Sequence, residues 1–231
     1  MSENVATVDD RGERALAPLR PAEPSRATAI ACRALDVVVA ALALVILSPL
    51  LLAIAVWIRL DTRGPALFRQ ERLGRGMKPF TVNKFRTMHV NMTNDEHVAF
   101  VQRLIDGVAE RHDEMFKLAA DERVTRAGRI LRKTSLDELP QLFNVLRGDM
   151  SLVGPRPCLA YEAARYPSHA FGRFAVKPGI TGLWQVSGRS QLTFHEMIAL
   201  DLEYAARHSF WFDVLILLRT VPVVMGGRGA A

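Results

Sequence analysis

The residues best suited to chemistry are two adjacent carboxylates, Asp137 and Glu138, in the stretch TSLDELPQ at 134–141. Ser135 and Glu138 have the S-x-x-E spacing of a helix capping box, which explains the glutamate without any chemistry. The same position also has a chemical consequence, because a carboxylate in a first helical turn feels the positive helix end and stays ionised. A phosphate binds well at such a helix end. Asp137 would then be an anionic nucleophile toward phosphorus, and the residues alone leave both interpretations open.

Basic residues accompany the carboxylate pair, and the ordinary explanation of each is a solvated helix face. Arg156 differs, because Pro155 and Pro157 fix the backbone on both sides of it and limit where the guanidinium can go. Arginine is suited to bidentate contacts with phosphate, and a glutamate beside bound phosphates can hold a hard cation such as Mg²⁺. The other candidates before and after the pair are Arg123, Arg126, Arg129, Arg132, Lys133 and, closing KPGITGLWQVSGR at 177–189, Arg189. In that last stretch Gly179, Gly182 and Gly188 permit close backbone approach.

The composition restricts the kind of partner. A formal net charge of +6 favours an acidic one, such as anionic lipid, a phosphorylated substrate or nucleic acid. Nucleic acid is disfavoured, because no aromatic residues are interleaved with the basic ones and no recognised module is present. Cys32 and Cys158 match no spaced metal motif. No ligand spacing is found either among His89, His97, His112, His169 and His208.

The elements that must position these residues begin after a tail. Residues 1–28 are rich in Pro, Ala, Arg and acidic residues, so we expect them to be disordered. Residues 29–60 contain an uncharged run of 22 residues, 37–58. As a helix this run would reach ~33 Å, which is roughly the thickness of the hydrocarbon core of a bilayer. Ser48-Pro49 interrupts it at its midpoint, where proline breaks or kinks a helix.

The charges flanking this run do not favour opposite sides of the membrane for its two ends. Arg26 and Arg33 precede it and a basic segment from Arg59 to Lys78 follows, so the positive-inside rule places both ends in the cytoplasm. A re-entrant helix that is broken at Ser48-Pro49 and returns to the same face satisfies both flanks. A kinked single-pass helix is the alternative.

Three further elements follow from local signals. Turn residues at 74–76 between short apolar runs predict a β-hairpin over 66–88, which carries Lys84 and Arg86. Apolar residues at helical spacing predict a helix over 136–147 that ends at Gly148. Residues 210–225 are too short and too charged to span a membrane, and they fit either an interfacial helix or a buried core helix.

Six motifs in order resemble the bacterial sugar transferases, the small monotopic phosphoglycosyl transferases that begin glycan assembly on a polyprenyl phosphate. They are the Ser48-Pro49 break, KFRTM at 84–88, D-x-R-x-T-x-x-G at 121–128, LRKTSLDELPQ at 131–141, SLVGPRP at 151–157 and KPGITGLWQVSGR at 177–189. The resemblance covers the chain from Arg33 to its end. It implies an α-rich fold with a minor β component, in which a re-entrant helix, a β-hairpin and interfacial amphipathic helices surround a catalytic domain over 61–231.

The resemblance also implies a ping-pong reaction at the cytoplasmic face of the inner membrane. Asp137 attacks the sugar-bearing phosphate of a UDP-sugar and releases UMP, and undecaprenyl phosphate then takes the phosphosugar. Glu138 is the Mg²⁺ ligand or a supporting carboxylate, and Ser48 and Pro49 are structural. The implied phosphate-binding residues are Lys84, Arg86, Arg132, Arg156 and Arg189.

The motifs lean toward exopolysaccharide-initiating members that use glucose or galactose phosphate, and a homo-oligomer is compatible with the sequence. Two other functions are kept as alternatives. One is a non-catalytic, membrane-anchored scaffold of a glycan-assembly complex, against which the intact Asp137-Glu138 pair counts. The other is a transferase that moves the sugar without its phosphate and releases UDP in place of UMP.

Overall fold

The computed structural model describes residues 25–90, 123–188 and 191–226. The described chain is mostly helical with two small two-stranded sheets, which confirms the expected α-rich fold with a minor β component. The expected tail lies outside the described residues as far as position 24, and so does Arg189. Residues 26–28 of that expected tail belong to the first helix.

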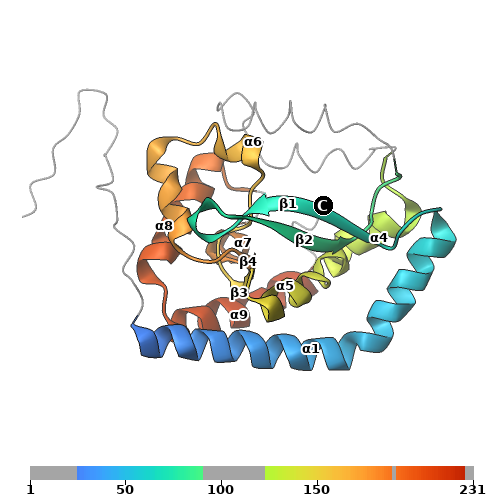
Figure 1. Ribbon diagram of the computed structural model, residues 1–231, viewed down its shortest axis with the longest axis horizontal. Helices are drawn as coiled ribbons and strands as arrows, with labels where there is room; N and C mark the ends of the chain where they lie inside the picture. Colours follow the sequence, from blue (N-terminus) through green and yellow to red (C-terminus); the bar gives the residue numbers. More distant parts are fainter. Residues whose placement is uncertain (1–24, 91–122, 189–190, 227–231) are drawn as a thin grey trace, which may run out of the picture.

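The first element is one helix of 36 residues, α1 (Arg26–Asp61). Ser25 caps it, because its hydroxyl accepts a hydrogen bond of 3.1 Å from the backbone N–H of Thr28. Pro49 lies inside the helix, and the Ser48 hydroxyl donates to the carbonyl of Val45 at 2.8 Å. Both features bend helices. Figure 1 shows α1 running beneath the domain and then turning upward, so the expected break is a bend within one continuous helix.

Both halves of α1 pack against the rest of the chain, and no residue between Ala40 and Ile54 is buried. The buried residues of α1 are Cys32, Asp36 and Ala40 in the first half and Ile54 and Ile58 in the second. Asp36 accepts hydrogen bonds from the Ser151 hydroxyl at 2.9 Å and from the backbone N–H of Leu152 at 2.8 Å. By length and composition α1 can cross a membrane, and no other helix of the described residues meets that test.

The predicted β-hairpin is confirmed. Strand β1 (Leu67–Leu73) pairs antiparallel with β2 (Pro79–Phe85), with Leu67 opposite Phe85 and Leu73 opposite Pro79. A 3₁₀ turn, η1 (Arg75–Met77), connects the strands, and Gly76 has the positive φ of 65° that the turn requires.

Arg86, which directly follows β2, joins the hairpin to the end of α1. Its side chain is 4% exposed, and its guanidinium donates to the carbonyl of Arg63 at 2.6 Å and to that of Thr62 at 2.9 Å. These carbonyls directly follow the C-terminal end of α1, where backbone acceptors lack helical partners. The expectation that Arg86 holds phosphate is therefore corrected, because its donors face the end of α1.

The helix predicted over 136–147 is divided into two elements. Ser135 adopts a left-handed conformation, with φ at 56°, after α4 (Arg126–Thr134). A single 3₁₀ turn, η3 (Leu136–Glu138), follows, and α5 (Gln141–Arg147) begins only after Pro140. The C-terminal end at Gly148 is as predicted, with φ at 90°.

The remaining elements complete the core. They are β3 (Ser151–Val153), α6 (Ala160–Ala163), η4 (Ser168–Ala175), β4 (Gly179–Thr181), α7 (Leu183–Ser187), α8 (Phe194–Arg207) and α9 (Phe210–Met225). β3 and β4 form a short parallel pair. The main core cluster joins Ala40 of α1 to β2, α5, β3, α8 and α9, and its most buried members include Val145, Met150, Tyr204 and Ile216.

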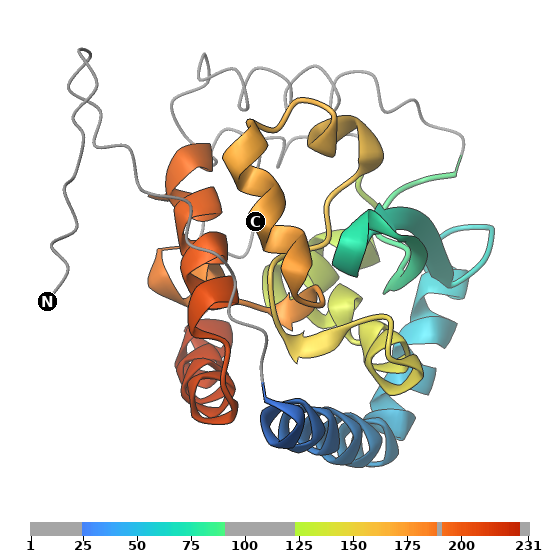
Figure 2. The ribbon, with the colours of Figure 1, turned by 60° about the vertical axis from the view of Figure 1, so that its left-hand side comes forward.

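Helix α9 (Phe210–Met225) has the bounds predicted for the C-terminal helix, with one face buried and another exposed. Asp213 and Ile216 are buried in the core, whereas Trp211 and Leu218 are 77% and 66% exposed. Figure 2 shows α9 and α1 at the same side of the molecule, and the two helices are in contact. Large apolar residues of α1 are also exposed, Val45 at 73% among them. The two helices thus present exposed apolar side chains suited to a membrane.

The contact made by Arg86 predicts a stability effect. Replacing Arg86 with Met removes charged donors from these partly buried carbonyls and should cost about 2 kcal/mol of the free energy of unfolding. For a chain of this size that lowers the unfolding temperature by about 4–8 °C. The measurement is thermal unfolding in detergent, followed by circular dichroism. Arg69→Met is the matched control, because Arg69 is exposed on the same hairpin. Equal unfolding temperatures for the two variants would contradict the contact.

Candidate active site

The carboxylate pair lies in η3, next to strand β2. Lys84 of β2 donates to Glu138, with 2.8 Å between Nζ and Oε1, and the two side chains are 22% and 23% exposed. Ser135 makes no side-chain capping hydrogen bond to η3. The capping box proposed for Ser135 and Glu138 is therefore not formed, and the Glu138 carboxylate is directed to a lysine of another element.

Glu138 and Lys84 line a pocket with residues from five further places in the chain. β1 contributes Arg72, α5 contributes Gln141, and the segment after β3 contributes Arg156. The remaining lining residues are Val82, Pro157, Gly179, Ile180 and Gln185. None of the lining residues belongs to α1, so Ser48 and Pro49 shape the helix and take no part in the pocket.

The two carboxylates differ in their electrostatics. Burial, followed by repulsion from Glu138, raises the pKa of Asp137 to about 6, although Lys84 and Arg132 act in the opposite direction. Burial works to raise the pKa of Glu138 too, but Lys84 and then Arg156 outweigh it and lower that pKa. Near neutral pH both groups are ionised, and Asp137 is the more basic of the two. A more basic carboxylate is the better nucleophile.

Arg132 lies on α4, and its electrostatic effect on Asp137 places it close to that carboxylate. Its Nε donates to the hydroxyl of Thr87 at 3.1 Å, which orients the guanidinium. The predicted Lys84, Arg132 and Arg156 are thus brought together with Asp137 and Glu138. Arg86 is not, and Arg189 lies outside the described residues.

Arg156 is exposed between the buried Pro155 and Pro157. Its backbone is held from behind by Arg173 of η4, which donates to the carbonyl of Arg156 at 2.8 Å. Arg173 forms a buried ion pair with Asp201 of α8, with 2.7 Å between Nη2 and Oδ2. Sequence reasoning missed this pair, because its members are 28 residues apart and lie in no motif.

Arg72 is the other functional residue that the sequence analysis overlooked. It was counted only as a basic residue of the membrane flank, although it precedes the hairpin turn by two residues. Its guanidinium donates to the carbonyl of Pro157 at 2.8 Å and to Oε1 of Gln70 at 2.9 Å. Burial and then the charge of Arg156 lower the pKa of Arg72, which reflects two cations held close together.

The glycines of the last motif permit the backbone approach expected of them. A Cβ atom on Gly179 would lie 2.1 Å from the backbone nitrogen of Gly154, and one on Gly182 would lie 2.4 Å from its carbonyl oxygen. This contact holds the segment carrying Arg156 against β4 and α7. Three cations, Arg72, Lys84 and Arg156, therefore surround one carboxylate, and the excess positive charge suits a phosphate-bearing ligand.

The donor set also fits a magnesium ion. Two adjacent carboxylates supply hard oxygen ligands, and the raised pKa of Asp137 reflects, after burial, the repulsion between them. Glu138 is the residue that would hold the ion, together with oxygens of bound phosphates, beside Asp137.

Comparison with known proteins identifies the family. Residues 27–227 match the model of the bacterial sugar transferases. The UDP-glucose:undecaprenyl-phosphate glucose-1-phosphate transferase of Caulobacter vibrioides is 46% identical over 221 residues, covering 91% of this chain and 76% of that protein. The undecaprenyl-phosphate galactose phosphotransferase of Salmonella typhimurium is 43% identical over 200 residues, covering 86% and 41%.

A third relative resembles this chain in length. The exopolysaccharide production protein ExoY of Rhizobium meliloti is 39% identical over 201 residues, which cover 87% of this chain and 88% of that protein. By contrast, the chain spans only 41% to 43% of the length of several curated relatives, the Salmonella protein among them. The match of the family model to nearly all described residues, together with these identities, shows that the chain belongs to the bacterial sugar transferase family.

Proposed function

We propose that the protein transfers a sugar 1-phosphate from a UDP-sugar to undecaprenyl phosphate and so begins the assembly of a polysaccharide. The names of the Caulobacter and Salmonella relatives give this reaction type and this acceptor. The observation that carries the proposal is the pocket, in which Glu138 lies beside the cations Arg72, Lys84 and Arg156, next in the chain to the more basic Asp137.

The first step is an attack by Asp137 on the sugar-bearing phosphorus of the donor. A carboxylate oxygen forms the new P–O bond, the bond to the bridging oxygen breaks, and UMP leaves with that oxygen. The desolvation that raises the pKa of Asp137 favours this step, because a poorly solvated carboxylate is more reactive. Lys84, Arg72 and Arg156 neutralise the charge on the diphosphate as the carboxylate approaches.

Magnesium is the cofactor we propose for this step. When bound, it would offset the repulsion between the carboxylates and the diphosphate. Glu138 is suited to hold it, because its pKa is lowered and it stays ionised across the working pH range. Lys84 fixes the Glu138 carboxylate through the 2.8 Å ion pair, and Arg132 remains to orient Asp137.

In the second step the phosphate oxygen of undecaprenyl phosphate attacks the same phosphorus. The bond to Asp137 breaks, the carboxylate is restored, and the product carries the sugar on a diphosphate. The acceptor keeps its head group at the membrane surface, so the pocket has to lie there as well. The exposed apolar residues of α1 and α9 support that position.

We further propose that α1 is re-entrant and that the pocket faces the cytoplasm, where UDP-sugars are made. Pro49 bends the helix, and both of its halves pack against the same domain, which supports an entry and a return on one face. Glucose and galactose are the sugars named in the relatives' reactions, and they are the donors we expect.

A donor panel tests the reaction class. Detergent-solubilised protein with Mg²⁺ and undecaprenyl phosphate should release UMP from UDP-glucose or UDP-galactose, and Asp137→Asn should abolish that release because the amide is not a nucleophile. UMP release is measured by chromatography, with correct folding of the variant checked by circular dichroism. Release of UDP would indicate direct sugar transfer. No nucleotide release from folded wild-type protein across a broad panel would favour the scaffold function.

Glu138→Gln removes a charge at similar size, so it should strongly lower the rate of UMP release and change the dependence of that rate on Mg²⁺. The rate is measured at several Mg²⁺ concentrations for the variant and the wild type. An unchanged Mg²⁺ dependence would show that Glu138 is not a ligand of the metal ion.

The pKa of Asp137 predicts the pH dependence. Asp137 must be ionised to attack, so kcat/KM for UMP release should be full above pH 7 and fall as the pH decreases through about 6. Lys84 lowers that pKa, so Lys84→Met should move the fall to higher pH. Lys78→Met, an exposed lysine of the same hairpin, is the control that should leave the profile in place. A profile that Lys84→Met does not move would contradict this electrostatic account.

A further inference from the structure

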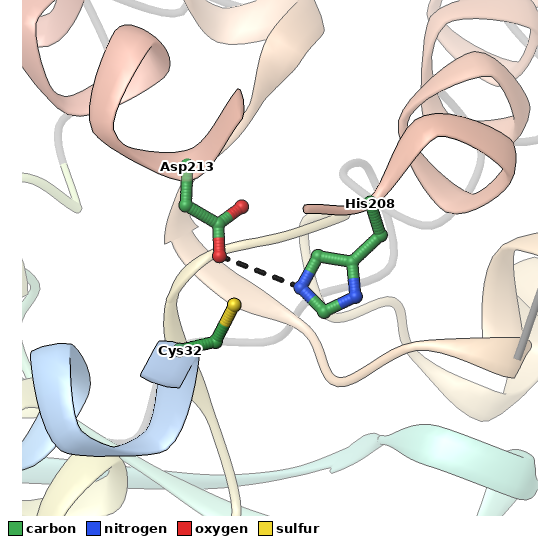
Figure 3. A group of neighbouring side chains, drawn as sticks. All are labelled: Cys32, His208 and Asp213. Carbon is green, nitrogen blue, oxygen red and sulfur yellow. Dashed lines mark ion pairs between the residues drawn. The ribbon is translucent and has the colours of Figure 1, made fainter. Parts of the chain in front are cut away.

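A second group of reactive side chains lies away from the pocket, where α1 meets the junction of α8 and α9. It consists of Cys32, His208 and Asp213 (Figure 3). The ligand atoms of the three, a sulfur, a ring nitrogen and a carboxylate oxygen, all lie within 4.8 Å of one another. Cys32 and Asp213 are buried, and His208 is nearly so, with 15% of its side chain exposed. None of the three lines the pocket described above.

Buried carboxylates lie at and near this place. The Asp213 side chain is 3% exposed, and its only ion-pair partner among the described residues is His208. Asp36, also buried, lies one helical turn beyond Cys32, and Arg33 and Lys177 act electrostatically with it. Buried carboxylates are ordinarily paired with a full cation or coordinate a metal ion.

The separation of His208 and Asp213 suits an ion between these two side chains better than a direct hydrogen bond. Nε2 of His208 and Oδ2 of Asp213 are 3.4 Å apart, longer than the ~2.7–2.9 Å of a charge-assisted hydrogen bond. Two ligand atoms bound at ~2.0–2.1 Å to a tetrahedral ion are separated by about 3.3–3.4 Å. Figure 3 shows the sulfur of Cys32 directed toward the same space as the two other groups.

A hydrogen bond from Tyr204 also orients the Asp213 carboxylate. The hydroxyl of Tyr204, a residue only 1% exposed, donates to Oδ1 of Asp213 at 2.8 Å. This bond leaves Oδ2 facing His208. Carboxylates that bind metals are commonly held by such a hydrogen bond from a neighbouring side chain.

We propose that Cys32, His208 and Asp213 bind one zinc ion. A thiolate, an imidazole and a carboxylate are the ligands that zinc prefers, and a water molecule would complete the tetrahedron. The Cys32 thiol gives its proton to solvent when the ion binds. The site connects the first half of α1 to the start of α9, so its role is to fix the membrane helix to the catalytic domain. The ligands lie at positions 32, 208 and 213, which explains why no spaced motif revealed them.

Cobalt substitution tests the site. Full-length protein carrying no polyhistidine tag is stripped with a chelator and titrated with Co²⁺. We expect one Co²⁺ per chain, a thiolate-to-cobalt charge-transfer band in the near ultraviolet, and displacement by one equivalent of Zn²⁺. Cys32→Ser should abolish the band, whereas Cys158→Ser should retain it, since Cys158 is a second buried cysteine outside the group. Tyr204→Phe should weaken metal affinity about 10- to 100-fold.

Several results would overturn the proposal. They are the absence of stoichiometric binding by folded wild-type protein, or a band that survives in Cys32→Ser or disappears in Cys158→Ser. If Cys32→Ser does not fold, His208→Asn takes its place, and stoichiometric binding that persists in this variant counts against the site. The readout is spectroscopic, so it is independent of the transferase reaction.

Discussion

The ion pair between Lys84 and Glu138 is the contact on which the arrangement of the pocket depends. It joins the hairpin to the 3₁₀ turn that carries both carboxylates, and it removes Glu138 from any capping role. Because Glu138 stays ionised beside Lys84, its charge helps burial to raise the pKa of Asp137 to about 6. One lysine thus keeps the two neighbouring carboxylates distinct, one as a fixed anion and the other as the more basic group.

The rest of the chain supplies cations to this pair from several directions. Arg72 comes from the hairpin, and Arg156 comes from a proline-bounded segment that is held by the buried pair of Arg173 and Asp201. Helix α1 contributes no pocket residue but packs at both ends against the domain, and Arg86 secures its second end. The exposed apolar residues of α1 and α9 support a position at a membrane surface. The phosphate head group of a lipid substrate lies at the same surface.

Local signals in the sequence predicted the features that local interactions determine. The hairpin around 74–76, the end of α5 at Gly148 and the bounds of α9 follow from turn residues, glycine and apolar spacing. The features that were missed depend on contacts between distant segments. Arg86 and Lys84 look alike in the motif KFRTM, yet one faces the end of α1 and the other the pocket. The β3–β4 pair and the Arg173–Asp201 ion pair also join residues that no spacing relates.

The most direct test of the central claim is intact-protein mass spectrometry after incubation with a UDP-sugar and Mg²⁺ but no acceptor. Our account predicts a mass increase of one sugar phosphate, located on the peptide that contains Asp137 and lost again when undecaprenyl phosphate is added. Product formation with no such adduct at any time, or an adduct on a different residue, would contradict the role given to Asp137.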